Sequence, residues 1–505
     1  MIGFCLSLLC LVLGYFLYGT FVEKVFGADP GRKTPCYTHA DGSDYIPMPT
    51  WKVYTVQFLN IAGTGPIFGA LMGVLYGPAA FLWIVFGCLL GGAMHDYMSG
   101  MISIRRDGAS LPEIIGDELG RTCRIVMRIV TLVLMLCVGA SFVMIPSGLM
   151  EQLTERLVGV AGTGLLWTVL IFLFYMSVTV FSIDKIIGNV YPIFGVALLL
   201  MAILVCGGLF LGEGSVPSLS ESFADHYPVA STPLYPGLFI TIACGAVSGF
   251  HATQSPMIAR CIKNERYGLR CFYGAMVTEG IVALIWAAAA VKYADAYDVS
   301  GIALAEGFDA DLNTVYGKLY CIMTDGGNAK MNPALLVNLL CDDWLGVTGL
   351  VLAILGIVAA PMSTGGSAFR CARLICADFT GYGQQSVVRR VLLALPLFGI
   401  AILMLNVSSF KVLWLYVSWF NQVLATFTFF TIAHYLRHRT DGRASKSCTW
   451  LISFIPAVFM LSVSSMFILV DKDNGFGLPV ETSVWLAGAV TVAFTMLYLW
   501  YDNRD

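Results

Sequence analysis

The sequence predicts an all-α polytopic membrane protein whose core is an inverted repeat of five helices followed by five more. The chain has 505 residues, of which 58% are hydrophobic and 12% are charged, whereas a soluble protein of this size carries roughly a quarter charged residues. Apolar stretches of about 20 residues recur along nearly the whole chain, and this is the length that a helix needs to cross a bilayer. Two of these stretches, five spans apart, are interrupted by glycine and proline.

Thirteen membrane-spanning helices are expected, with one before the repeat and two after it. The first apolar stretch has no basic region before it and no small-residue cleavage site, so we expect a retained helix and not a signal peptide. Glycine, proline and polar clusters separate the other spans. The expected ranges are 2–22, 51–76, 78–103, 125–149, 163–182, 189–212, 236–258, 271–292, 345–369, 389–407, 410–436, 449–470 and 482–501.

The basic residues indicate how these spans are oriented. If the loop 23–50 is cytoplasmic, 23 of the 29 lysines and arginines lie on the cytoplasmic side and 6 lie outside. Loops of multi-pass proteins carry their excess of lysine and arginine on the cytoplasmic side. We therefore expect a multi-pass protein of the cytoplasmic (inner) membrane, with its N-terminus outside and its C-terminus inside.

The same count divides the chain. We expect an N-terminal helix and cytoplasmic loop, a first five-helix repeat, an outer loop, a second five-helix repeat and two C-terminal helices, over 1–50, 51–212, 213–235, 236–436 and 437–505. Because five crossings are an odd number, the second repeat starts on the opposite side of the membrane from the first. The second repeat includes an outer segment, 293–344, in which "SGIALAEGF" and "NPALLVNLLCDDW" are expected to form two short helices over the mouth of a cavity. A passive ordered loop is the alternative.

The first interrupted helix contains "FLNIAGTGPIFGALMGV", residues 58 to 74. Pro66 has no amide hydrogen, so the carbonyl of Ala62 loses its helical partner, and glycines 63 and 65 each cost about 1 kcal/mol in a helix. An unpaired backbone group in lipid costs several kcal/mol, so such a break is tolerated only where it lines a cavity or is buried in protein. A second interpretation is that the glycines at 65, 69 and 73 only allow close helix packing.

The second interrupted helix contains "IACGAVSGFHATQSP", residues 242 to 256. Interrupted helices in corresponding positions of two halves indicate the binding site of an inverted-repeat transporter. Half-helix N-terminal amides can anchor a substrate carboxylate. The predicted substrate-binding residues are Asn60, Gly63, Thr64, Gly65, Ser248, His251 and Gln254.

Ionisable residues also lie at membrane depth. His95 and Asp96 are about two turns inside the cytoplasmic end of their helix, and we predict that they form a proton relay. The alternative is a structural Asp96 that is paired with His95 or Arg105. Glu279, near the middle of its helix, ranks below Asp96 because no polar residues accompany it in the sequence.

Hydroxyl side chains cluster in "AAPMSTGGSAFRCAR", where Ser363, Thr364 and Ser367 follow Pro361. Hydroxyls together with freed carbonyls form a hard oxygen environment that suits Na⁺. Hydrogen bonding to a carbonyl one turn earlier is an equally good interpretation of these hydroxyls.

Other functional classes are not supported by the sequence. The net charge is −3, so no basic field indicates nucleic acid. No hydrolase elbow, P-loop or zincin motif is present, and no loop could hold a nucleotide-binding domain, so we expect neither an enzyme nor a cofactor. The cysteines lack metal-binding spacing; Cys321 and Cys341, both expected outside the cell, are the one candidate disulfide pair.

Long stretches of the chain resemble one known family. The run from "NIAGTGPIFG" through "WIVFGCLLGGAMHDYMSGMISIRRDGASLPEIIG", together with "SGFHATQSPMIAR", closely resembles the carbon starvation protein A (CstA) family, and the likeness covers most of residues 10 to 400. Members are described as peptide transporters induced by nutrient limitation, and long members also as proton-coupled pyruvate transporters. The family is grouped with the amino acid/polyamine/organocation transporters, which implies a LeuT-like fold. That fold implies a sodium position between the backbone of Ala62 to Gly65 and the hydroxyls of Ser363 and Thr364.

We therefore expect a secondary active transporter that imports a small organic nutrient, a peptide by this resemblance, in response to carbon starvation. A proton or sodium gradient would drive it, with sodium held by Ala62, Ser363 and Thr364. The alternatives are a proton-coupled symporter of pyruvate or another small carboxylate, a channel, and a nutrient sensor without transport. The expected partners are the small-molecule substrate and the lipid bilayer.

Overall fold

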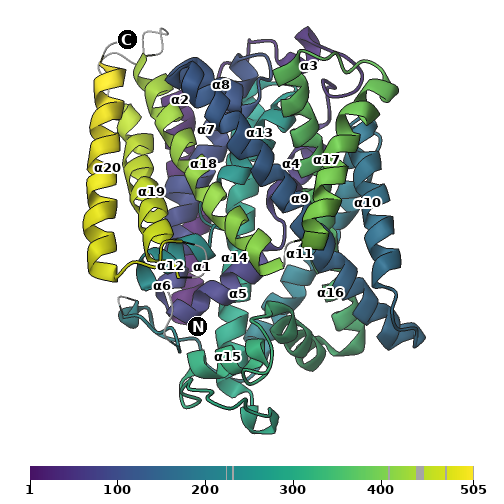
Figure 1. Cartoon of the computed structure of the whole chain (residues 1–505), viewed down its shortest axis with the longest axis vertical. Helices are drawn as coiled ribbons and strands as arrows, with labels where there is room; N and C mark the ends of the chain where they lie inside the picture. Colours follow the sequence, from purple (N-terminus) through teal and green to yellow (C-terminus); the bar gives the residue numbers. More distant parts are fainter. Residues whose placement is uncertain (223, 230–232, 408–409, 439–447, 473–474, 504–505) are drawn as a thin grey trace.

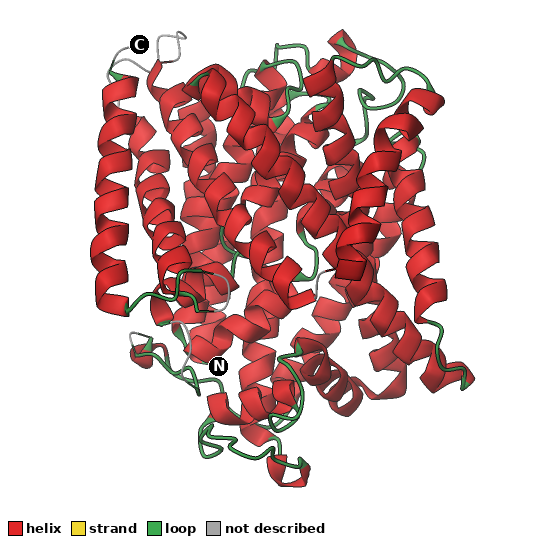
Figure 2. Cartoon of the chain, viewed as in Figure 1, coloured by secondary structure: helices red, strands yellow, loops and turns green. Residues whose placement is uncertain are grey.

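A computed structural model describes residues 1–222, 224–229, 233–407, 410–438, 448–472 and 475–503. In these residues the regular structure is entirely helical, and most long helices run side by side in one bundle (Figure 2). The N-terminus lies toward one end of the bundle and the described C-terminal residues lie at the other (Figure 1). Ends on opposite sides are what an odd number of crossings predicts.

One span precedes the first repeat, and the repeat itself opens with a broken helix. The first span, Ile2–Phe26, consists of α1 (Ile2–Gly14), η1 (Tyr15–Gly19) and α2 (Thr20–Phe26), and the short α3 (Pro35–Thr38) follows. The first repeat contains α4 (Thr50–Ile61), η2 (Gly65–Gly69), α5 (Ala70–Gly73), η3 (Val74–Tyr76), α6 (Ala79–Phe86), η4 (Gly87–Gly92), α7 (Ala93–Arg105), α8 (Leu111–Leu119), α9 (Arg121–Val158), α10 (Gly164–Val180) and α11 (Ile187–Leu211).

The second repeat also opens with a broken helix, and two helices follow it. It contains α12 (Leu234–Thr241), α13 (Gly249–Ala259), η6 (Glu265–Tyr267), η7 (Leu269–Tyr273), α14 (Gly274–Ala296), η8 (Val299–Gly301), α15 (Val315–Thr324), α16 (Pro333–Thr380), α17 (Val387–Val407) and α18 (Phe410–His438). Before it lies η5 (Leu219–Glu221), and after it lie η9 (Cys448–Trp450), α19 (Leu451–Val470) and α20 (Val480–Asp502). Each of the thirteen predicted ranges falls on one or more of these helical elements; the domain boundaries drawn from them stay a prediction.

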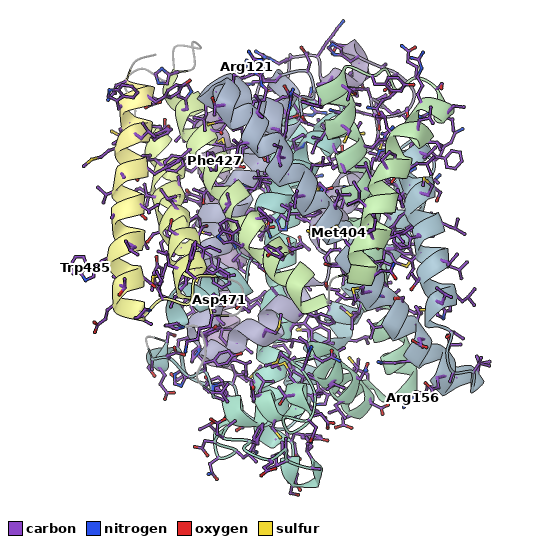
Figure 3. The ribbon with its side chains drawn as sticks, in the orientation of Figure 1. Arg121, Arg156, Met404, Phe427, Asp471 and Trp485 are labelled. Atoms are coloured by element: carbon purple, nitrogen blue, oxygen red, sulfur yellow. The ribbon has the colours of Figure 1, made fainter. Side chains whose placement is uncertain are left out.

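Length and composition make several of these helices suitable for a bilayer. Among the described residues, eight helices are long and apolar enough to span it, and Thr50–Ile61 with Gly65–Tyr76, bent by 52°, forms a ninth candidate. The lipid-facing character is clear on α20, where the side chain of Trp485 projects from the bundle (Figure 3) and is 80% exposed. In α9, Arg121 and Arg156 lie near opposite ends of the bundle (Figure 3), so the helix carries charge only where it leaves the apolar region.

The outer segment differs from the prediction in one of its two helices. The predicted helix over 300–308 is wrong: only η8 forms there, and the backbone then bonds across the segment, from Ala305 N–H to the Gly326 carbonyl (2.8 Å). The helix that forms instead is α15. The predicted start at Asn332 is confirmed, since its side chain accepts a hydrogen bond from the Ala334 N–H (3.1 Å).

Two further features of this segment follow from α15 and α16. The α16 chain turns at Gly346, whose φ of 65° is left-handed and favours glycine, and this turn separates the outer helix from the span that follows. Cys321 in α15 and Cys341 in α16 are buried free thiols, so the candidate disulfide is not formed in the structure.

The predicted cytoplasmic loop is fastened to the bundle by a buried charge cluster. Asp44 accepts hydrogen bonds from Arg370 Nε (3.1 Å) and from an Arg373 guanidinium nitrogen (3.1 Å), and Arg370 also donates to the carbonyls of Val178 and Phe181 (both 2.8 Å). Burial alone would raise the pKa of the Asp44 carboxyl, but the adjacent guanidinium groups hold it well below its usual range. The loop thereby joins the ends of α10 and α16.

Candidate transport site

The two broken helices meet at their breaks. After α4 ends at Ile61 the chain leaves the helix, resuming at Gly65; α12 ends at Thr241 and α13 begins at Gly249. A Cβ atom on Gly65 would lie 2.3 Å from the Cβ of Cys244, and one on Gly69 would lie 2.9 Å from the Thr241 carbonyl. The predicted breaks are therefore present. The glycines at 65 and 69 also allow close packing of the two segments, which was the second interpretation of these residues.

A mainly apolar cavity lies beside this contact. Its volume is about 30 Å³, which is room for about two water molecules. Its lining comes from both breaks and from α9, α16 and α18: Ile61, Gly63, Gly65, Gly69, Val138, Phe142, Thr241, Ala243, Cys244, Phe250, Thr364, Val417, Ser418 and Asn421. Of the predicted substrate-binding residues, only Gly63 and Gly65 are in this lining.

Asn421 of α18 is a site residue that sequence reasoning missed. Its side-chain oxygen accepts hydrogen bonds from the Phe250 N–H (2.6 Å) and from Ser248 Oγ (3.1 Å). It therefore caps the N-terminus of α13, where the helix dipole favours a negative partner. The sequence signal was the polar pair Asn421 and Gln422 inside an otherwise apolar span.

The other predicted binding residues have different positions. Asn60 and Thr64 are completely buried, and their side-chain nitrogen and oxygen atoms have no hydrogen-bond partner among the described residues. Gln254 donates to Thr253 Oγ1 (3.0 Å), and its oxygen lies 3.6 Å from the Cys371 sulfur. The structure therefore turns Gln254 toward α16 and not into the cavity.

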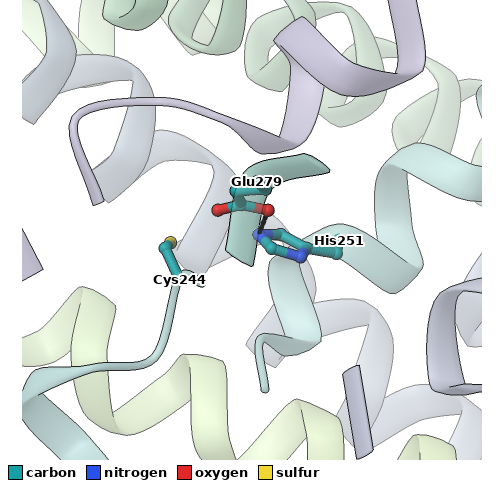
Figure 4. A group of neighbouring side chains, drawn as sticks. All are labelled: Cys244, His251 and Glu279. Atoms are coloured by element: carbon teal, nitrogen blue, oxygen red, sulfur yellow. Dashed lines mark ion pairs between the residues drawn. The ribbon is translucent and has the colours of Figure 1, made fainter. Parts of the chain in front are cut away.

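Four ionisable side chains form a continuous buried row next to the breaks. His95 Nδ1 lies 3.0 Å from one oxygen of Asp96, and His251 Nδ1 lies 3.4 Å from the other. The row ends at Glu279, whose carboxylate lies 3.6 Å from His251 Nε2 (Figure 4). All four side chains are fully buried. The structure thus joins the predicted relay pair on α7 to a residue predicted to bind substrate on α13.

Glu279 is the second residue that sequence reasoning undervalued. Apart from Thr278, no polar residue lies near it along α14. It nevertheless faces His251, and Cys244 completes a group whose ligand atoms lie within 4.8 Å of one another. Figure 4 shows these three side chains directed toward one point between α14 and the second break. The feature of the sequence that could have identified Glu279 was the carboxylate itself, because an ionisable residue at membrane depth is by default a functional candidate.

Of the predicted sodium ligands, Ser363 and Thr364 come together, and they do so around the carbonyl of Leu59 and not that of Ala62. Ser363 Oγ donates to the Leu59 carbonyl (2.9 Å) and to the Ala360 carbonyl (2.7 Å), and Thr364 Oγ1 contacts the same two oxygens (3.0 and 3.1 Å). The hydroxyls therefore bond one turn back, as their alternative interpretation held, and also reach across to α4. Leu59, one turn before Ala62, supplies the α4 oxygen that these hydroxyls contact.

Comparison with known proteins identifies the family. The family model described as "Carbon starvation protein CstA" matches residues 1–219 and 208–311. The chain belongs to the CstA family. An uncharacterized membrane protein of Haemophilus influenzae is 42% identical over 328 residues, which are 56% of this chain and 88% of that protein.

Two CstA relatives from Escherichia coli carry functional names. The peptide transporter CstA is 31% identical over 352 residues, covering 54% of this chain and 47% of the relative. The pyruvate/proton symporter BtsT is 31% identical over 348 residues, covering 54% and 46%. The chain thus spans about half the length of the named transporters that it matches, and these relatives are transporters and not enzymes.

The fold of this CstA-family chain matches that of solved membrane transporters. A mutant of the manganese transporter of Eremococcus coleocola superposes with a TM-score of 0.59 at 14% sequence identity, over 92% of this chain and 99% of that one. At this identity the likeness concerns the fold alone. The predicted fold class, an all-α multi-pass membrane protein, is confirmed.

Proposed function

We propose that this CstA-family protein is a secondary active transporter that imports a small organic nutrient during carbon starvation, driven by protons. The observation that carries the proposal is the buried row His95, Asp96, His251 and Glu279 beside the two helix breaks. A peptide is the first candidate substrate and pyruvate or another small carboxylate is the second, in line with the names of the relatives.

The row offers proton acceptors on three helices that belong to both repeats. Asp96 lies on α7 of the first repeat, while His251 and Glu279 lie on α13 and α14 of the second. Imidazole and carboxylate groups exchange protons readily, and the two contacts of His251 at 3.4 and 3.6 Å are longer than a good hydrogen bond. A small movement between the repeats, or one bridging water, would complete the row, and a movement in the opposite direction would break it. Protonation would thereby be linked to alternating access.

The cavity between the breaks is the proposed substrate site. Its walls are mostly apolar, and one of its polar side chains, Asn421, lies at the N-terminus of α13. A substrate carboxylate would be attracted to this N-terminus, where the Asn421 oxygen now accepts the Phe250 N–H. The free carboxylate shared by peptides and pyruvate suits this position equally well.

Sodium is the second candidate coupling ion. The hydroxyls of Ser363 and Thr364 and the carbonyls of Leu59 and Ala360 bring four oxygens together at hydrogen-bond distances. Neutral hydroxyl and carbonyl oxygens suit a hard monovalent cation. A bound sodium ion would be coordinated by oxygens of α4 and of α16 and would thereby link the two helices. The carbonyl of Ala62 stays a proposed ligand.

Uptake by proteoliposomes tests the proposal. Purified protein is reconstituted, a proton or sodium gradient is imposed, and accumulation of labelled dipeptides and of labelled pyruvate is measured. We expect accumulation of one substrate class that stops when a protonophore collapses the proton gradient. Flux without accumulation would indicate a channel, and binding without flux would indicate a sensor; either result contradicts the proposal.

The variant Asp96→Asn tests the relay within the same assay. The amide keeps the size of the side chain but cannot accept a proton, so gradient-driven accumulation should be lost while substrate exchange between the two sides persists. Persistent accumulation would show that Asp96 has only a structural role. Protein abundance and a monodisperse elution profile serve as the controls for folding.

A further inference from the structure

A second group of ionisable side chains lies far from the transport cavity, at the end of the bundle where the described C-terminal residues lie (Figure 1). His434 and His438 project from α18, and Asp502 is near the end of α20. Each offers one ligand atom, and these atoms lie within 4.8 Å of one another. Neither the proton row nor the cavity uses any of these residues.

The spacing of the three atoms suits a transition-metal ion. His434 and His438 are four residues apart on one helix, so they share a face, and their rings stack with centroids 4.4 Å apart. The Asp502 oxygen lies 3.0 Å from His438 Nε2 and 3.8 Å from His434 Nε2. Bonds of about 2.0 to 2.1 Å to zinc place tetrahedral ligand atoms roughly 3.3 Å apart. One of the two observed distances is slightly shorter than this separation, and the other is slightly longer.

The surroundings of the three residues add an independent observation. Glu118 of α8 lies 3.1 Å from His434 Nδ1, and Arg106 in turn holds Glu118 (2.6 Å). A carboxylate on the far nitrogen of a histidine is the usual support of a zinc-binding imidazole, because it fixes the tautomer that presents Nε2 to the metal. Arg437 binds the other oxygen of Asp502, which leaves the oxygen nearest the histidines for a metal.

We propose that His434, His438 and Asp502 form a binding site for one zinc-class divalent ion, with Glu118 as a positioning residue. Two imidazoles and one carboxylate favour Zn²⁺ over Mg²⁺ or Ca²⁺. A fourth ligand would be water, since the His438 side chain is 28% exposed. The ion would fasten α20 to α18, and so join the two C-terminal helices to the second repeat.

Metal binding by the purified full-length chain tests this site. The protein is prepared without a polyhistidine tag, stripped with a chelator and titrated with Zn²⁺ in competition with a fluorescent zinc indicator, while elemental analysis gives the stoichiometry. We expect one Zn²⁺ per chain, no competition from Mg²⁺, and a higher unfolding temperature with Zn²⁺ than without it. Absence of binding in the wild type would overturn the proposal.

Variants then assign the ligands. His438→Gln, at a partly exposed position, should lower Zn²⁺ affinity by about tenfold or more, and Glu118→Gln should lower it by about 10- to 100-fold. His39→Gln is the matched control, because His39 is an exposed histidine beside a carboxylate, Asp107. The Zn²⁺ affinity of this variant should equal that of the wild type. Unchanged affinity in His438→Gln would overturn the assignment.

The buried group of Cys244, His251 and Glu279 is the rival metal site. Loss of Zn²⁺ binding in His251→Gln, with binding retained in His438→Gln, would place the ion there and overturn the proposal. If the metal-free unfolding temperature of His438→Gln matches that of the wild type, a loss of binding reflects the ligand and not misfolding.

Discussion

At the scale of single residues, the contacts of Glu279 give this lone carboxylate a partner that its own helix does not provide. Burying a carboxylate is costly unless it is paired, and here the imidazole of His251 lies 3.6 Å away. The same imidazole lies 3.4 Å from Asp96. His251 is thus the residue through which the two carboxylates can communicate.

Replacing Glu279 with glutamine should lower proton-driven accumulation by about tenfold or more, because the amide cannot carry the proton. Exchange of substrate in the absence of a gradient should be retained. Labelled-substrate counterflow and uptake in proteoliposomes measure the two quantities. Glu306→Gln, at an exposed position in the outer segment, is the control; equal accumulation in both variants would exclude Glu279 from the coupling path.

Asp44 provides a prediction for stability and pH. Asp44→Asn leaves two buried guanidinium groups, Arg370 and Arg373, without their carboxylate, and loss of one partner from a buried cluster costs roughly 3 to 5 kcal/mol. Because the folded-state pKa of Asp44 is lowered, its stabilisation is present above the ordinary carboxyl pKa of about 4 and is lost as the pH falls below it.

Thermal unfolding in detergent should therefore show a large difference between wild type and Asp44→Asn at neutral pH, and a smaller one as the pH falls below about 4. Asp309→Asn, at an exposed position, should match the wild type at every pH. A difference that stays constant with pH would mean that Asp44 acts through packing and not through its charge.

At the scale of the helices, the two breaks are matched to each other. Gly65 lies against Cys244, and Gly73 lies against Ile242, with the positions of their missing Cβ atoms 2.3 and 2.2 Å from those side chains. The second break therefore occupies the space that the glycines of the first leave open. An interrupted helix is stable here because another interrupted segment packs on it.

Gly65→Ala should destabilise the protein by about 1 to 3 kcal/mol, the usual cost of overpacking, and should reduce transport. Adding Cys244→Gly should restore part of both losses, because the clashing side chain is removed. Gly488→Ala on α20, where an added Cβ meets nothing within 4 Å, is the control. Unfolding temperatures and uptake are measured; a harmless Gly65→Ala would show that the two breaks do not pack tightly.

At the scale of the whole molecule, the N-terminus and the described C-terminal residues lie at opposite ends of the bundle (Figure 1). The helices α3 and α8 lie at one end of the bundle, whereas α15 lies at the other (Figure 1). The predicted cytoplasmic loop and the predicted outer segment thus lie at opposite ends, as the distribution of basic residues requires.

Reporter fusions test the orientation in the cell. A fluorescent protein fused after α20 should fluoresce, because the C-terminus is predicted to be cytoplasmic, while alkaline phosphatase at the same position should be inactive. Fusion after Gly477, in the connection between α19 and α20, should give the reverse pattern. An inactive fluorescent protein and an active alkaline phosphatase after α20 would show that the C-terminus is outside, and the predicted topology would then be wrong.

The sequence by itself determined the spans, the two breaks and the ionisable residues at depth, because each depends on local composition that lipid constrains strongly. It did not predict α8 or α15, since short helices outside the bilayer have no requirement for length or hydrophobicity. Only the tertiary structure decided which groups meet: Glu279 with His251, Asn421 with the start of α13, and Leu59 with the hydroxyls of α16. These partners lie on different helices, and their distances depend on how those helices pack, which no local pattern in the sequence records.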